Sequence, residues 1–102
     1  EAEFRQSGFR GPLNRYRNHE RDFAWLQGYK DRKIEQPSLF IGGTSDPATF
    51  LFGAVSDPVA MMRMFAPKVE GHILSGVGHW TQQEKPEAVT RILIDWLEGL
   101  EA

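Results

Sequence analysis

The sequence predicts an α/β domain built around a parallel sheet, and three observations support this fold class. From residue 37 onward, short apolar segments alternate with segments of helical pattern. The apolar segments are flanked by proline or glycine residues, as buried strands commonly are. An amphipathic helical pattern follows each of them, which is typical of βα units whose helices cover a parallel sheet. Since two strands do not make a stable parallel sheet, we expect further strands outside these 102 residues.

The segment before residue 37 is predicted to be helical. Glu1–Ser7 has the pattern of a helix end, with Gly8 as its stop signal. A second helix is expected from Leu13 to Gln27, because this segment lacks proline and glycine and its apolar residues share one face. Gly11-Pro12 opens that segment, where proline suits a first helical turn. Nothing precedes Glu1–Ser7 for it to pack on, so we expect the chain to be part of a longer protein.

The rest of the chain alternates between strands and helices. We expect a strand over Pro37–Gly43, a helix over Pro58–Ala66, a strand over Gly71–Ser75 and a helix over Pro86–Leu97. Ser56 or Asp57 is the expected N-cap of the first helix, and Pro67 its stop. Gly99 is expected to close the last helix.

Composition indicates a small globular protein. The 102 residues are 40% hydrophobic and 25% charged, with a net charge of −2, which gives no electrostatic reason to expect a nucleic-acid or membrane partner. The sequence has no cysteine, which excludes disulfides and thiol chemistry. No apolar run approaches the roughly 20 residues of a membrane span, and no signal-peptide pattern is present. We therefore expect a cytoplasmic protein, and no cofactor is predicted.

Two polar residues that follow the predicted strands are the candidates for chemistry. Asp46 comes shortly after the first strand, and His79 follows the second. Because the carboxyl ends of neighbouring parallel strands meet at one edge of a sheet, we expect these side chains to lie close together. A carboxylate that accepts from one imidazole nitrogen fixes the tautomer and leaves the other nitrogen free as a general base.

Structural roles stay open for each candidate at this point. A histidine after a strand often serves packing alone, and Asp46 before a proline has the chemistry of a turn. Tyr16, on an apolar helix face, is by default a core tyrosine, and Trp80 fits a packing role beside the His79 loop. The sequence contains no Gly-x-Ser-x-Gly elbow, no phosphate-binding loop and no zinc-ligand spacing.

Three motifs together resemble the C-terminal third of the α/β-hydrolase-fold epoxide hydrolases. They are Gly11–Asn18, which contains an Asn-x-Tyr-Arg-Asn element, Pro37–Gly43 followed by Asp46, and Gly78–Pro86, which contains His79. They occur in the order of that family and cover nearly the whole chain. One departure is Arg15, where the family commonly has tryptophan. The resemblance implies an α/β-hydrolase fold, with residues 1–36 as the end of the helical cap, or lid, and residues 37–102 as the last two βα units of the core.

The resemblance also implies a role for each candidate. Tyr16 matches one of two lid tyrosines that hydrogen-bond the oxygen of the epoxide substrate. An aspartate nucleophile opens the ring and forms an alkyl-enzyme ester, and His79, oriented by Asp46, activates the water that hydrolyses the ester to a vicinal diol. Trp80 is assigned to substrate binding. The nucleophile, the second tyrosine and the oxyanion hole would lie in an N-terminal part, which is the partner that this chain needs.

Two other interpretations stay open. A haloalkane dehalogenase or a serine ester hydrolase of the same fold would differ in the upstream part, although Tyr16 in its motif favours an epoxide hydrolase. The chain could also be a packing or interaction module without catalytic function, whose exposed sheet edge would require a partner.

Overall fold

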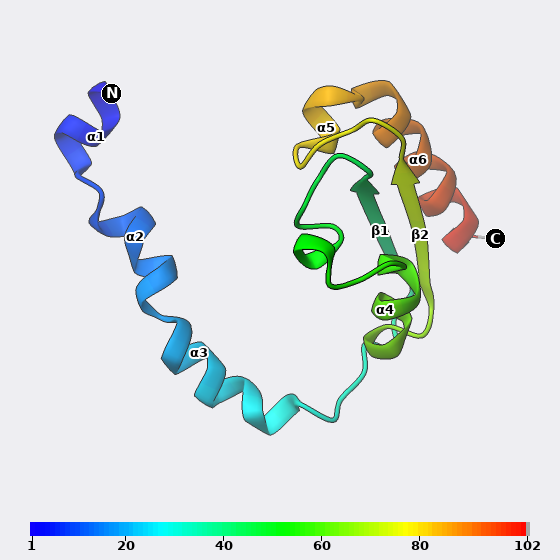
Figure 1. Cartoon of the computed structure of the whole chain (residues 1–102), viewed down its shortest axis with the longest axis horizontal. Helices are drawn as coiled ribbons and strands as arrows, with labels where there is room; N and C mark the ends of the chain where they lie inside the picture. The colour runs from blue at the N-terminus through cyan, green and yellow to red at the C-terminus, as the bar shows by residue number, and fades with distance from the viewer. Residues whose placement is uncertain (102) are drawn as a thin grey trace. The chain divides into compact units, whose positions relative to one another are not determined.

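The computed structural model describes residues 1–101, and it divides into two compact units between Arg32 and Lys33 (Figure 1). The first unit is helical, and the second contains both strands. The sequence predicts a boundary slightly later, between Gln36 and Pro37. The assignment of the two regions to a cap and a core stays a prediction.

The first unit consists of short helices in succession. They are α1 (Ala2–Ser7), α2 (Arg10–Arg17), α3 (His19–Leu26) and the 3₁₀ turn η1 (Gln27–Tyr29). Gly8 ends α1 with a positive φ of 67°, which confirms its predicted role as a stop signal. The prediction of one helix from Leu13 to Gln27 is wrong, because the segment is divided at Asn18 (φ −87°, ψ 0°), which ends α2 and precedes α3. Asparagine is a poor interior helix residue, since its side chain competes for the neighbouring backbone groups.

No side chain of these four elements is buried. Their local contacts are mainly aromatic. The rings of Phe4 and Phe9 stack at 4.6 Å, and those of Trp25 and Tyr29 lie 4.7 Å apart. This unit therefore leaves large apolar side chains exposed, among them Phe23 and Trp25.

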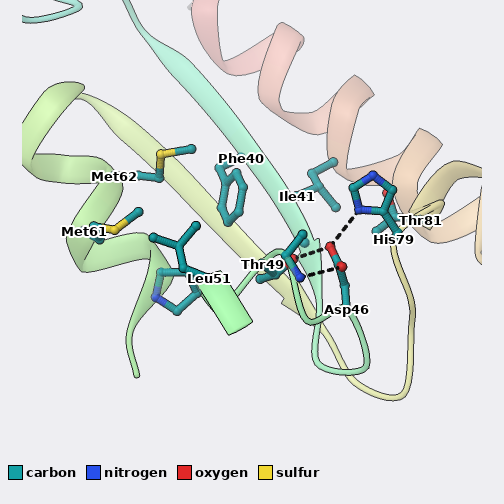
Figure 2. A pocket seen from close by; sticks show the side chains of 12 residues that line it. Phe40, Ile41, Asp46, Thr49, Leu51, Met61, Met62, His79 and Thr81 are labelled. Atoms are coloured by element: carbon teal, nitrogen blue, oxygen red, sulfur yellow. Dashed lines mark hydrogen bonds and ion pairs between the residues drawn. The ribbon is translucent and has the colours of Figure 1, made fainter. Parts of the chain in front are cut away.

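The second unit is a parallel strand–helix–strand arrangement followed by two helices. Strands β1 (Ser38–Gly43) and β2 (Val69–Leu74) pair from Ser38–Val69 through Gly43–Leu74, and α4 (Pro58–Phe65) connects them. Helices α5 (Thr81–Glu84) and α6 (Pro86–Glu101) follow β2. Figures 1 and 2 show the strands lying between α4 and α6. The predicted α/β class and parallel pairing are confirmed.

The helix ends of this unit test the predicted start and stop signals. Asp57 caps α4, since its Oδ1 accepts a hydrogen bond of 2.9 Å from the N–H of Ala60, as expected. The predicted stop of the last helix at Gly99 is wrong, because α6 continues to Glu101. A glycine near a helix end costs less than about 1 kcal/mol relative to alanine, which is too little to end an amphipathic helix by itself.

Glycines allow the elements of this unit to approach closely. A Cβ atom on Gly71 would collide with Val59 of α4, and one on Gly43 would collide with the carbonyl of Val77. The loop after β2 is therefore held directly against the end of β1, and Val77 is only 1% exposed. Among residues 1–101, no helix combines the length and apolar character that a membrane crossing requires.

Candidate active site

The turn after β1 positions Asp46. The chain leaves the strand at Gly43, and the N–H of Asp46 donates back to the carbonyl of Gly43 at 3.2 Å. The N–H of Ser45 donates to the carbonyl of Val77 at 2.9 Å, which ties this turn to the loop after β2. Asp46 is thereby held at the end of β1 and is buried, with 7% of the residue exposed.

The loop after β2 positions His79. Gly76 adopts a positive φ of 70°, which glycine tolerates without strain. Its N–H donates to the hydroxyl of Thr44 at 2.7 Å. Two residues later, the N–H of Gly78 donates to the Glu84 carboxylate at 2.9 Å. The backbone on the N-terminal side of His79 is thus held from the β1 turn and from α5.

The structure brings Asp46 and His79 together. The Nδ1 atom of His79 lies 3.0 Å from Oδ2 of Asp46, although 33 positions separate the two residues in the sequence. The Asp46 side chain is 9% exposed and the imidazole 60% exposed. Figure 2 shows the imidazole and Thr49 on opposite sides of the carboxylate. The pair therefore consists of a buried carboxylate acceptor and an imidazole that is accessible to water.

Further donors stabilise the ionised form of Asp46. The N–H of Ala48 donates to Oδ1 at 2.9 Å, and the hydroxyl of Thr49 donates to Oδ2 at 2.9 Å. The hydrogen bond from His79 is the main cause that lowers the pKa of the Asp46 carboxyl below its ordinary value. Partial desolvation opposes that change in pKa, and the donors from Ala48 and Thr49 reinforce it.

The ionisation of Asp46 determines the tautomer of His79. An ionised carboxylate can only accept hydrogen bonds, so the proton of the pair lies on Nδ1 of His79. The neutral imidazole then carries its lone pair on Nε2, for which no protein partner is present in residues 1–100. A lone pair at an exposed imidazole nitrogen is what a general base requires.

An apolar cavity of about 260 Å³ lies beside the pair. Its walls include Phe40 of β1 and Met61 and Met62 of α4 (Figure 2). Asp46 and His79 are the two titratable residues among those that line it. The cavity thus combines an apolar lining with one acid–base pair, a composition common in small-molecule sites.

The remaining predicted site residues are Tyr16 and Trp80, which belong to different units. Tyr16 belongs to α2 in the first unit, is 66% exposed, and has its ring 6.0 Å from that of His19. Trp80 is 58% exposed and meets the His79 ring edge-on at 5.3 Å. Residues 1–100 contain no cluster of three acidic or histidine side chains that could hold a metal ion.

Two residues that contact this site were not predicted from the sequence. Glu84 binds the backbone next to His79; it lies within the Gly78–Pro86 motif, but no role was predicted for it. Thr49 binds Asp46, and it lies in a segment without a distinctive pattern. The Thr49 contact could have been predicted from a hydroxyl residue three positions after an aspartate in a turn, because such side chains often form local hydrogen bonds.

Known proteins resemble this chain over nearly its whole length. No family model matches it. Epoxide hydrolase B of Mycobacterium tuberculosis is 40% identical over 100 residues, which are 97% of this chain and 27% of that protein. Bifunctional epoxide hydrolase 2 of Rattus norvegicus is 43% identical over 96 residues, which are 94% of this chain and 16% of that protein. The crystal structure of epoxide hydrolase A from Mycobacterium thermoresistibile matches with a TM-score of 0.80 and 36% identity.

The structural match covers 96% of this chain and 30% of the solved one. The chain thus spans less than a third of the length of each of these relatives. The matched part is their C-terminal part, and their fold is the α/β-hydrolase fold. In sequence and in fold, the chain therefore corresponds to the C-terminal part of the α/β-hydrolase-fold epoxide hydrolases.

Proposed function

We propose that this chain supplies the water-activating half of an epoxide hydrolase. One observation carries the proposal: His79 donates from Nδ1 to the buried Asp46 carboxylate and keeps Nε2 free beside an apolar cavity. The similarity to named epoxide hydrolases supports an epoxide as the substrate. The same pair would also suit a haloalkane dehalogenase or an ester hydrolase, but the similar proteins named above are epoxide hydrolases.

The proposed reaction has two covalent steps. A carboxylate from the upstream part attacks a carbon of the epoxide, so that an ester bond forms and the ring C–O bond breaks. The ring oxygen takes a proton from a hydrogen-bond donor, a role that we assign to Tyr16 together with a second donor from the upstream part. Water then attacks the ester carbonyl and gives its proton to Nε2 of His79. The ester C–O bond breaks, and the leaving diol oxygen takes that proton back from His79. The carboxyl group left on the nucleophile then gives up its own proton, which restores the donor that protonated the ring oxygen.

Each residue has a distinct part in this scheme. Asp46 stabilises the imidazolium that forms when His79 takes the proton from water. Trp80, edge-on to the imidazole, contributes an apolar surface to substrate binding. Residues 1–36 are proposed to be the end of the lid, and residues 37–102 the end of the core domain. We propose a cytoplasmic location for the enzyme.

The upstream part is the partner that the proposal requires. Both units leave apolar side chains exposed, including Phe23, Trp25 and Phe65. Both strands also keep one unpaired edge within residues 1–101. The relatives are more than three times as long as the segment that they share with this chain. An upstream segment that carries the nucleophile and further strands would cover these surfaces.

A chimera tests the proposal. The chain would replace the matching C-terminal part of Mycobacterium tuberculosis epoxide hydrolase B, to which it is 40% identical. With styrene oxide as substrate, we expect the chimera to produce the diol and the chain alone to produce none. In the His79→Gln chimera the ester should accumulate, and intact mass spectrometry should find protein heavier by the mass of one epoxide.

Two controls make the result specific. The unaltered relative shows that the assay works, and a Thr90→Val chimera, changed at an exposed position of α6, should turn over as the chimera does. A folded His79→Gln chimera that still releases diol at the unaltered rate, without a covalent adduct, would exclude His79 as the base of ester hydrolysis.

A further inference from the structure

The Asp46 carboxylate divides its hydrogen bonds unevenly between its two oxygens. Oδ1 accepts from the backbone N–H of Ala48. Oδ2 accepts from two side chains, the imidazole of His79 at 3.0 Å and the hydroxyl of Thr49 at 2.9 Å. The oxygen that binds the imidazole is therefore shared with a second donor.

The end of β1 is shaped to admit Thr49. A Cβ atom on Gly42 would lie 2.9 Å from both Cγ2 and Oγ1 of Thr49, closer than real Cβ contacts occur. Gly42 is buried, so the threonine packs directly against the backbone of the strand. This close approach is an observation independent of the hydrogen bond, and it fixes the Thr49 hydroxyl beside Asp46.

We propose that Thr49 is a positioning residue that tunes the basicity of His79 by sharing the Oδ2 atom of Asp46. A carboxylate oxygen that accepts a second hydrogen bond offers less negative charge to the imidazolium. Removal of the Thr49 hydroxyl should leave more of that charge to the imidazolium and so favour proton uptake by His79. The inference rests on the proposed function, because only there does a neutral His79 act as a base.

Within residues 1–100, few other charges lie beside this pair. The cavity walls from β1 and α4 are formed by uncharged side chains. Glu84 of α5 is the charged group next to the pair on the β2 side, within residues 1–100. Its carboxylate accepts a hydrogen bond from the N–H of Gly78. Thr49 therefore differs from the other neighbours in reaching the acceptor oxygen itself.

Substitution of Thr49 tests the inference directly. Thr49→Val keeps the shape and removes the hydroxyl, Thr49→Ser keeps the hydroxyl, and Thr90→Val is a matched control on the exposed face of α6. In the full chain, the His79 ring protons would be followed by NMR against pH. We expect the midpoint to rise by roughly half a pH unit in Thr49→Val. It should return to the original value in Thr49→Ser and stay unchanged in Thr90→Val.

A second variant covers the case in which Thr49→Val does not fold. Gly42→Ala keeps the hydroxyl but displaces Thr49, so it should raise the midpoint in the same direction. An unchanged midpoint in folded Thr49→Val, or in folded Gly42→Ala if Thr49→Val does not fold, would overturn the inference.

The chimera gives the kinetic counterpart. The rate of ester hydrolysis should fall on the acidic side of its pH profile. In Thr49→Val this fall should shift to higher pH by the same amount, and in Thr49→Ser it should return to its original pH. If the NMR midpoint moves in Thr49→Val but the folded chimera makes no diol, the proposed function would be refuted and the effect of Thr49 would stand. If the chimera makes diol but the NMR midpoint of His79 is the same in Thr49→Val, the effect of Thr49 would be refuted and the proposed function would stand.

Discussion

The Glu84 carboxylate accepts a hydrogen bond of 2.9 Å from the N–H of Gly78, the residue before His79. The contact is close, since a Cβ atom on Gly78 would lie 2.6 Å from Oε1 of Glu84. Glu84 belongs to α5, so this short helix fixes the loop that carries the imidazole. The geometry of the Asp46–His79 pair thus depends on a residue beyond the pair itself.

Loss of this contact should loosen the His79 loop. Glu84→Ala removes the acceptor and is expected to lower the free energy of unfolding by about 1 kcal/mol, as for one hydrogen bond. Glu84→Gln keeps an acceptor oxygen and should lose less. Urea denaturation of the full chain measures both values. Equal stability of Glu84→Ala and the unaltered chain would mean that the hydrogen bond contributes nothing to the fold.

Two glycines should respond to alanine in opposite directions. At Gly43 a Cβ would meet the backbone carbonyl of Val77, which cannot move without disturbing the active-site loop, so Gly43→Ala should cost roughly 2 kcal/mol or more. Gly99 lies in α6 with open space around its Cα. Gly99→Ala should therefore stabilise the chain by up to about 1 kcal/mol. Thermal unfolding of the two variants compares them directly, and destabilisation by both would contradict the open environment of Gly99.

Asp46 should make stability depend on pH in the acidic range. Its pKa is lowered in the folded chain below the ordinary value of 3.8, mainly by the hydrogen bond from His79. The unfolded chain therefore takes up the proton first as pH falls. The stabilisation is complete above the unfolded-state pKa and is lost as pH drops through the lower folded-state value. Asp46→Asn removes this titration.

The measurement is the free energy of unfolding of both proteins from pH 5 to pH 2. The difference in the free energy of unfolding between the unaltered chain and Asp46→Asn should shrink in the lower part of this pH range. A difference between the two that stays constant with pH would mean that the Asp46 pKa is the same in the folded and unfolded states.

Sequence patterns predicted the α/β class and the strand–helix–strand order because each depends on local signals. The β1 segment stands between a proline and two glycines, and Asp57 with Pro58 marks the start of α4. The meeting of Asp46 with His79 also followed, since neighbouring parallel strands end at one edge of the sheet.

The errors lie where a weak local signal competes with its surroundings. Asn18 interrupts the predicted long helix, whereas Gly99 does not stop α6. The contacts of Thr49 and Glu84 were not predicted, because they depend on close approaches at Gly42 and Gly78 that side-chain spacing does not encode. Sequence periodicity describes single elements, and these contacts arise between a loop and a strand or between a helix and a loop.

Tyr16 is the residue of the first unit that the proposed reaction uses, and its loss should slow ring opening. Tyr16→Phe removes one donor to the epoxide oxygen while the second donor stays, so we expect the single-turnover alkylation rate of the chimera to fall about tenfold. Ester hydrolysis should be unaffected, since it depends on His79. Tyr29→Phe is the matched control, because that ring packs on Trp25 and beneath Arg32 in the same unit. Rapid-quench mass spectrometry separates the two steps, and an unchanged alkylation rate in Tyr16→Phe would reduce Tyr16 to a structural tyrosine.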